Sequence, residues 1–190
     1  MQAREMLKQF WKFLRSDSWG AMLASVLIAI ILILYVFFPL LKAATGTVLP
    51  LVIVESCSMY HEEVGFETTL GNNAHPLEHL DLEGTKDWIF PKGLTKGDII
   101  FVVRPKNLKQ GDVVIFSGGS AHPIIHRLVK NTEPYATFGD NNGGQLSGEK
   151  NIQNNQLIGK SVFKIPYLGW VKLFFFDFRS NEPGACYSKI

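Results

Sequence analysis

The sequence predicts a mainly β protein that is carried on one N-terminal transmembrane helix. Two observations predict this fold class. Residues 21–41 read AMLASVLIAIILILYVFFPLL, with no charged residue. Further along, the chain changes to short β-branched runs that are bounded by Gly, Pro, Asn and Asp. The 190 residues, of which 46% are hydrophobic, suffice for one domain beside that helix.

The apolar stretch has the length of one membrane crossing. At about 1.5 Å per residue, it spans roughly 30 Å, the thickness of the hydrocarbon core. A cleaved secretory signal would be shorter and would end in small residues, whereas Phe37, Phe38, Leu40 and Leu41 close this run. A buried helix of a soluble core is the less favoured alternative, because such helices rarely are apolar all round for this length. We therefore expect a retained membrane anchor at 19–42.

The basic residues around the span predict its orientation. Four of them precede it, whereas Lys42 alone follows it before Lys86. The N-terminus should therefore face the cytoplasm, and residues 43–190 should form an extracytoplasmic β-rich domain. Apolar residues at helical spacing in 1–18 predict a cytoplasmic amphipathic segment on the inner membrane surface; an ordinary solvated helix is the alternative.

Charge and cysteine content bear on the class of protein. The net charge is only +2, and basic residues beyond the anchor are scattered among acidic ones, so no nucleic-acid partner is predicted. The two cysteines, Cys57 and Cys186, lie far apart in the sequence. Their spacing indicates neither a disulfide framework nor a zinc site.

We expect strands at 47–54, 98–103, 112–116, 124–129, 135–138 and 158–165. Gly-Asp pairs at 97–98 and 111–112 mark turns before two of them. An acidic stretch at about 60–95 interrupts the pattern and is interpreted as an insertion. His75 and His79 within it are four residues apart, but Pro76 follows directly and no third ligand is apparent, so no metal site is predicted.

Residues with catalytic chemistry concentrate in three places. Ser56 and Ser58 follow an apolar strand, where a serine needs a nearby base to become a nucleophile. His126 lies inside an apolar strand and could be that base, with His122 as the competing histidine. Asp140, in a Gly-Asp-Asn turn, could orient the imidazole. Taken singly, each has a plainer interpretation as a turn residue or a buried histidine.

Together, and in this order, these segments resemble type I signal peptidases. Residues 56–59 (Ser-Cys-Ser-Met) resemble the nucleophile box, 111–116 the Gly-Asp-Val-Val strand, 139–142 the Gly-Asp-Asn box and 165–169 the Ile-Pro-Tyr-Leu-Gly strand. His126-Arg127 matches the archaeal and endoplasmic-reticulum type, whereas the bacterial type has Lys-Arg there. The resemblance runs from about the anchor to Gly169, interrupted by the acidic stretch.

The resemblance implies a membrane-bound serine endopeptidase that removes signal peptides from exported preproteins after small residues. Ser58 would be the nucleophile, His126 the base and Asp140 the orienting acid, while Ser56 and the Ser58 N–H would form the oxyanion hole. No metal or organic cofactor is implied. The implied partners are preproteins and the lipid bilayer of the cell membrane, or of the endoplasmic reticulum in a eukaryote. Whether other membrane subunits take part is left open.

The chain departs from the family pattern at two points. His61 stands where the nucleophile box usually has proline. The family commonly has a second aspartate shortly after the Gly-Asp-Asn box; residues 143–147 contain none, and Glu149 is the nearest carboxylate. Two alternatives therefore remain: an inactive, membrane-tethered peptide-binding relative, and a peptidase of the same clan that processes another surface precursor. The presence of Ser58, His126 and Asp140 together favours an enzyme.

Overall fold

The computed structural model describes residues 2–61, 69, 85, 87–119, 122–176 and 186. The chain divides into two compact units, Met1–Ala44 and Thr45–Ile190. Most of the acidic stretch expected at about 60–95, including His75 and His79, lies outside the described residues.

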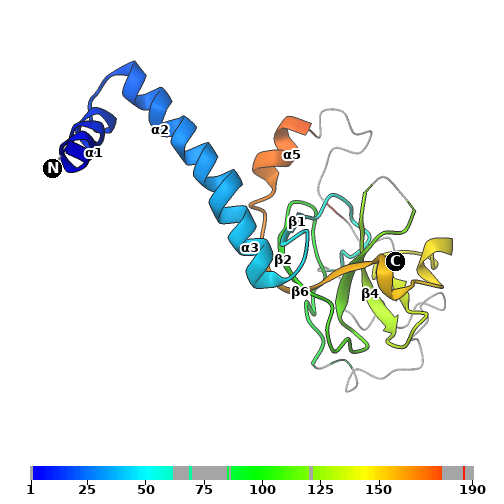
Figure 1. Ribbon diagram of the computed structural model, residues 1–190. Coiled ribbons are helices and arrows are strands. Elements are labelled where there is room, and N and C mark those ends of the chain that lie inside the picture. Colours follow the sequence, from blue (N-terminus) through cyan, green and yellow to red (C-terminus); the bar gives the residue numbers. More distant parts are fainter. Residues whose placement is uncertain are drawn as a thin grey trace. The chain divides into compact units, whose positions relative to one another are not determined.

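Helices form the first unit (Figure 1). Ser18 caps the second of them, because its side chain accepts a hydrogen bond from the Ala21 N–H at 3.2 Å. Pro39 has no N–H to offer the carbonyl one turn before it, and here the helix widens so that the Phe38 N–H bonds the Ile33 carbonyl. The elements are α1 (Gln2–Leu14), α2 (Trp19–Leu32), the π-helical turn η1 (Ile33–Phe37) and α3 (Phe38–Thr45).

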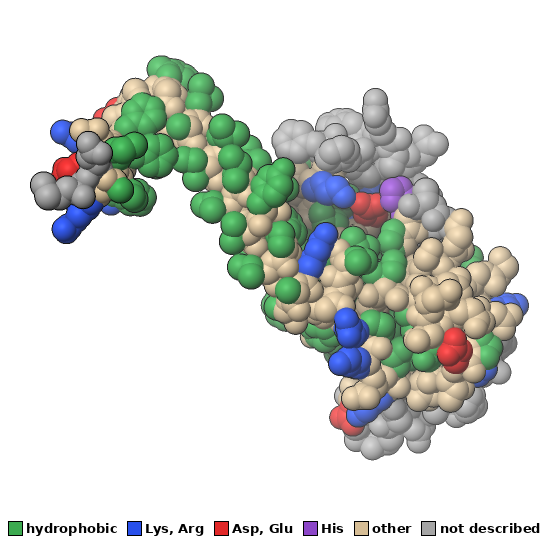
Figure 2. Space-filling view, in the orientation of Figure 1, with side chains coloured by type: hydrophobic (Ala, Val, Ile, Leu, Met, Phe, Trp, Pro, Cys, Tyr) green, Lys and Arg blue, Asp and Glu red, His purple; other side chains and the backbone are tan. Residues whose placement is uncertain are grey.

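One continuous helix, Trp19–Thr45, is long and apolar enough to cross a membrane. It has 27 residues, and its most apolar 18 residues have a mean hydropathy of 2.9, with only 6% of them buried. Apolar side chains are spread along its visible surface (Figure 2). These properties are consistent with a single-pass membrane protein, and the helix contains the anchor predicted at 19–42.

The second unit is built on a six-stranded antiparallel sheet in the order β1-β2-β6-β3-β4-β5. The mainly β fold class, with an apolar N-terminal helix, is thereby confirmed. The strands are β1 (Leu51–Ile53), β2 (Ile99–Val103), β3 (Val113–Phe116), β4 (Ile124–Lys130), β5 (Ala136–Phe138) and β6 (Leu157–Ile165). Short 3₁₀ turns η3 (Ser147–Glu149) and η4 (Asn154–Gln156) precede β6, and α5 (Trp170–Phe176) follows it.

Only the first strand differs clearly from its predicted bounds. It was expected at 47–54 and pairs only over Leu51–Ile53. Pro50 has no N–H for a ladder, Gly46 has a φ of +68°, and the Thr47 hydroxyl donates to the Ile158 carbonyl at 2.7 Å. Residues 46–50 therefore turn across the end of the sheet.

The core holds the central strands in place on both faces of the sheet. All four residues of β3 are buried. Val113 and Ile115 pack in one cluster with Met59, and Val114 and Phe116 pack in another with Leu128. Because β3 pairs with both β4 and β6, this packing fixes the strand that presents His126.

Candidate active site

The nucleophile loop, residues 54–61, leads from β1 into the core. Val54 and Met59 are buried, and the Met59 carbonyl accepts a hydrogen bond from the Leu94 N–H at 2.9 Å. Between these anchors Ser56 is exposed and Ser58 half-buried. Their hydroxyl oxygens lie 3.2 Å apart, so the loop presents two neighbouring hydroxyls from a fixed support.

His126 lies opposite Ser58 although 68 residues separate them in sequence. It sits in β4, paired with Val114 of β3, and only 3% of its surface is exposed. Its Nε2 atom is 2.9 Å from Ser58 Oγ, within hydrogen-bond reach. The structure thus brings together the serine and the histidine that the sequence singled out.

The other nitrogen of this imidazole faces Glu149. Glu149 is fully buried, and its Oε1 hydrogen bonds with His126 Nδ1. Thr137 Oγ1 donates to the same oxygen at 3.1 Å, and the Leu146 N–H donates to Oε2 at 2.7 Å. In the tautomer whose Nδ1–H donates to this carboxylate, Nε2 is the nitrogen that can accept the serine proton.

Asp140 was expected beside His126 and lies elsewhere. Its carboxylate accepts hydrogen bonds from Arg127, with Nε to Oδ1 at 2.9 Å and Nη2 to Oδ2 at 2.6 Å, and His61 Nε2 is 3.2 Å from Oδ2. The reason is the alternation of side chains along a strand: His126 and its neighbour Arg127 point to opposite faces of β4. A carboxylate that pairs with Arg127 is on the wrong face for the imidazole.

The Asp140 carboxylate is ionised in this setting. Burial alone would raise its pKa, but the charge of Arg127 and the hydrogen bonds from His61 and Arg127 lower the pKa from 3.8 to about 2. Asp140 therefore remains the negative partner of a buried cation across the neutral pH range.

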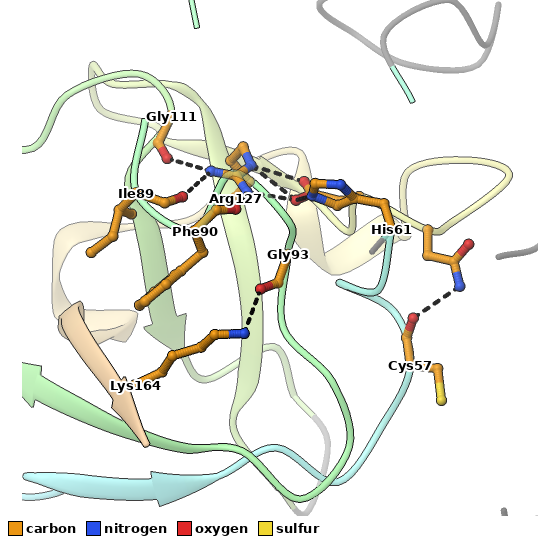
Figure 3. A network of polar contacts seen from close by, with 10 residues as sticks. Cys57, His61, Ile89, Phe90, Gly93, Gly111, Arg127 and Lys164 are labelled. Atoms are coloured by element: carbon orange, nitrogen blue, oxygen red, sulfur yellow. Dashed lines mark hydrogen bonds and ion pairs between the residues drawn. The ribbon is translucent and has the colours of Figure 1, made fainter. Parts of the chain in front are cut away.

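Arg127 connects β4 to the loops on this face (Figure 3). Its Nη1 donates to the carbonyls of Ile89 and Gly111, each at 2.9 Å, and Trp88 stacks with its centroid 5.4 Å from the guanidinium carbon. Because the Nε, Nη1 and Nη2 groups of its guanidinium all donate hydrogen bonds, Arg127 is held rigidly, and so is the strand that carries His126.

Asn141 connects the Gly-Asp-Asn turn to the nucleophile loop. Its backbone N–H donates to the Ser58 carbonyl at 2.8 Å, and its side-chain Nδ2 donates to the Cys57 carbonyl at 3.0 Å. The turn therefore supports the site from two adjacent residues, with Asp140 holding Arg127 and Asn141 holding the loop.

Cys57 and Cys186 form a disulfide with their Cα atoms 5.4 Å apart. The spacing of these cysteines leaves their redox state open, and the structure shows them paired. The separation of 129 residues hides the pair from any spacing rule, because only the folded chain brings them together.

A groove of about 790 Å³ runs past the two serines and His126. It is bordered by β1, by the segment that enters β4 and by residues 141–144. His122 is exposed and lines this groove, while His126 is the histidine within reach of Ser58. Among the residues that the structure describes, no cluster of three or more His, Cys, Asp or Glu could hold a metal ion.

The fold and the site define a class: an antiparallel β domain with a serine-histidine-carboxylate constellation, in a chain that has an apolar helix of membrane-crossing length. No protein-family model matches the chain. It is 28% identical over 97 residues to the signal peptidase complex catalytic subunit SEC11C of Homo sapiens, Canis lupus familiaris and Mus musculus. These matches cover 44% of this chain and 50% of each relative, so the chain spans about half the length of the curated relatives it matches. This similarity supports a relation of the chain to the signal peptidase family.

Proposed function

We propose that this chain is a membrane-bound serine endopeptidase that removes signal peptides from exported preproteins after small residues. The observation that carries the proposal is the hydrogen-bonded series Ser58, His126 and Glu149, in which Ser58 Oγ lies 2.9 Å from His126 Nε2. Similarity to the catalytic subunit of a signal peptidase complex supports the substrate class.

In the proposed reaction Ser58 Oγ attacks the carbonyl carbon of the scissile peptide bond while His126 Nε2 takes its proton. The resulting imidazolium gives that proton to the leaving amine, and a water molecule then releases the acyl group from Ser58. The Ser58 N–H and the Ser56 hydroxyl would stabilise the oxyanion; the Ser56 oxygen is 3.2 Å from Ser58 Oγ. Loss of one such donor typically slows acyl transfer by roughly a hundredfold to a thousandfold.

Glu149 takes the role of orienting acid in this mechanism, in place of Asp140. It contacts His126 Nδ1, so it can fix the tautomer and stabilise the imidazolium. Asp140 becomes a positioning residue, which acts through Arg127 on the strand that carries His126.

The groove beside Ser58 suits an extended peptide. Within the described sheet β1 is an edge strand that pairs with β2, and Leu51 and Ile53 line the groove. A substrate segment that lies along β1 would gain main-chain hydrogen bonds, and pockets for alternate side chains would select small residues.

The proposed location is the membrane, with the N-terminus in the cytoplasm and residues 43–190 outside. The excess of basic residues before the apolar helix favours this orientation. The Cys57–Cys186 disulfide is compatible with it, because disulfides persist mainly in oxidising compartments outside the cytosol.

The proposed function is tested by comparing variants of the two histidines, His126 and His122. Detergent-solubilised full chain is incubated with a preprotein, and the products are identified by mass spectrometry. We expect cleavage after a small residue by the wild type, nearly none by His126→Ala and almost normal cleavage by His122→Ala, because His126 Nε2 lies within hydrogen-bond reach of Ser58 Oγ.

Three results would contradict the proposal. A reversed order of the two variants would make His122 the base. A wild type that binds the preprotein without cutting it would favour the non-catalytic relative. Cleavage only of another class of surface precursor would favour the same-clan alternative.

A further inference from the structure

Cys57 occupies the position between the two serines of the proposed site. The Ser56 and Ser58 hydroxyls are 3.2 Å apart, and one residue separates them in the chain, so the backbone of Cys57 determines how they lie relative to each other. Any bond or contact that restrains Cys57 therefore also restrains the relative positions of both hydroxyls.

Cys57 is held from two directions. On its backbone, the carbonyl accepts hydrogen bonds from Asn141 Nδ2 at 3.0 Å and from the Tyr60 N–H at 3.1 Å. Through its side chain it is bonded to Cys186.

Cys186 is itself fixed in the β domain. It is only 7% exposed, and its sulfur accepts a hydrogen bond from the Lys96 N–H at 3.4 Å. Lys96 belongs to the turn before β2, whose Gly97 N–H donates to the Val54 carbonyl at the start of the nucleophile loop. The disulfide thus closes a ring of contacts from the end of β1 through Cys57 and Cys186 back to that turn.

We propose that Cys186 is a positioning residue for catalysis: its disulfide to Cys57 holds Ser58 and Ser56 in the reactive arrangement. The inference rests on the proposed function for its catalytic consequence, although the ordering of the loop can be measured without it. Cys186 comes from the C-terminal end of the chain, 128 residues after Ser58, and contributes to the site through a covalent bond.

A redox consequence follows. A dithiol such as dithiothreitol supplies two electrons and two protons to the sulfur–sulfur bond, giving two free thiols on the protein while the dithiol closes to its own cyclic disulfide. Reduction should then loosen the nucleophile loop while His126 and Glu149 keep their hydrogen bond.

The test compares Cys57→Ala, Cys186→Ala and the double variant with the wild type, each as full chain in detergent. Cleavage of a preprotein is measured below the unfolding temperature of every sample. We expect kcat to fall by about tenfold to a hundredfold with little change in KM, because small misplacements of a nucleophile cost that much. The three variants should be equal, since each removes the same bond. Dithiothreitol should lower the wild type to their level and leave the double variant unchanged.

A control separates positioning from stability. Val102→Ala removes a buried side chain of β2 that does not line the groove, so it should lower the unfolding temperature while kcat stays at the wild-type value. Equal kcat losses in Val102→Ala and Cys186→Ala would overturn the inference. A disulfide-free enzyme of wild-type kcat, or an effect on KM alone, would also overturn it. Alkylation of both cysteines in the unreduced wild type would do so as well, because the disulfide would then be absent.

Amide hydrogen exchange tests whether the disulfide orders the loop, and it does so even if the chain cleaves no preprotein. Absence of cleavage would refute the proposed function alone. We expect the Tyr60 and Asn141 amides, which bond the Cys57 and Ser58 carbonyls, to exchange faster in Cys186→Ala than in Val102→Ala. Unchanged exchange at both amides would show that the disulfide does not order the loop, and would overturn the inference.

Discussion

Glu149 and Asp140 are two buried carboxylates with different partners, and this difference sets their expected roles. Glu149→Gln should lower kcat by about 10³- to 10⁴-fold while the protein remains folded, because an amide can donate its N–H to His126 Nδ1 and favour the wrong tautomer. The measurement is kcat on a preprotein, with thermal unfolding recorded for each sample. If Glu149→Gln remained active while a folded Asp140→Asn lost all cleavage, the two roles would be reversed.

The stability that Asp140 contributes should depend on pH. Its pKa is lowered from 3.8 to about 2, so the folded carboxylate binds its proton more weakly than the unfolded chain does. The contribution is therefore complete above the unfolded pKa and is lost as pH falls through about 2. We expect Asp140→Asn to lose at least about 2 kcal/mol at neutral pH, since it also leaves Arg127 without its buried partner.

Urea unfolding of both proteins across a pH series measures this effect. The gap in free energy of unfolding should narrow as pH falls from about 4 toward about 2, the window set by the two pKa values. A gap that stays constant through this window would show that the Asp140 charge does not stabilise the fold.

The residue types of the site could be predicted better than their contacts. Ser58 and His126 stood out because each follows or occupies an apolar strand, and the structure brings them within 2.9 Å. Glu149 could be named only as the nearest carboxylate after the Gly-Asp-Asn box, because it reaches His126 only after residues 143–148 fold back and the Leu146 N–H closes the 3₁₀ turn onto its carboxylate. Because side chains alternate along β4, His126 and Arg127 point to opposite faces of the strand, so one carboxylate cannot pair with both. Asp140 pairs with Arg127.

At the scale of elements, local patterns predicted the strands well. β2 to β6 lie within a residue or two of their expected bounds, because β-branched runs and Gly-Asp turns determine where each begins. Gly97 and Gly111 have φ angles of +91° and +90°, and the aspartates that follow accept hydrogen bonds from Thr95 and Lys109. The order of strands could not be predicted, because it depends on pairings between distant segments such as β2 with β6.

Gly97 provides a test of this turn. A Cβ at this position would lie 2.2 Å from Trp170 Cδ1, in addition to the strain of a positive φ. Gly97→Ala should therefore destabilise the β domain by more than the roughly 1 kcal/mol that strain alone costs. Gly119→Ala is the matched control, because Gly119 has a φ of +83° and nothing within 4 Å of its Cβ position. Equal shifts in unfolding temperature would mean that contact with Trp170 does not require glycine.

For the whole molecule, the apolar helix and the basic residues before it predict a topology. Protease added outside intact cells or spheroplasts should reach the region after Lys42 and spare Arg4 to Asp17, because the more basic side of a span remains in the cytoplasm. Epitope tags at the two ends allow the fragments to be distinguished. Protection of the C-terminal domain would invert the orientation and remove the basis for an extracytoplasmic substrate.

The long-range contacts that hold the β domain together could not be predicted from the sequence. The Cys57–Cys186 bond and the Asn141 contacts to the nucleophile loop join segments that are 129 and 84 residues apart. Neither has a local pattern, because each side chain finds its partner only when the sheet has assembled.

The cleavage rate of Ser58→Ala relative to the wild type shows whether this chain cleaves preproteins with Ser58 as nucleophile. The substitution removes the attacking oxygen and little volume, and Ser58 is only half-buried, so both proteins should unfold at the same temperature. We predict that the wild type cuts the preprotein after a small residue and that Ser58→Ala leaves it intact. Cleavage by Ser58→Ala at the wild-type rate would show that Ser58 is not the nucleophile.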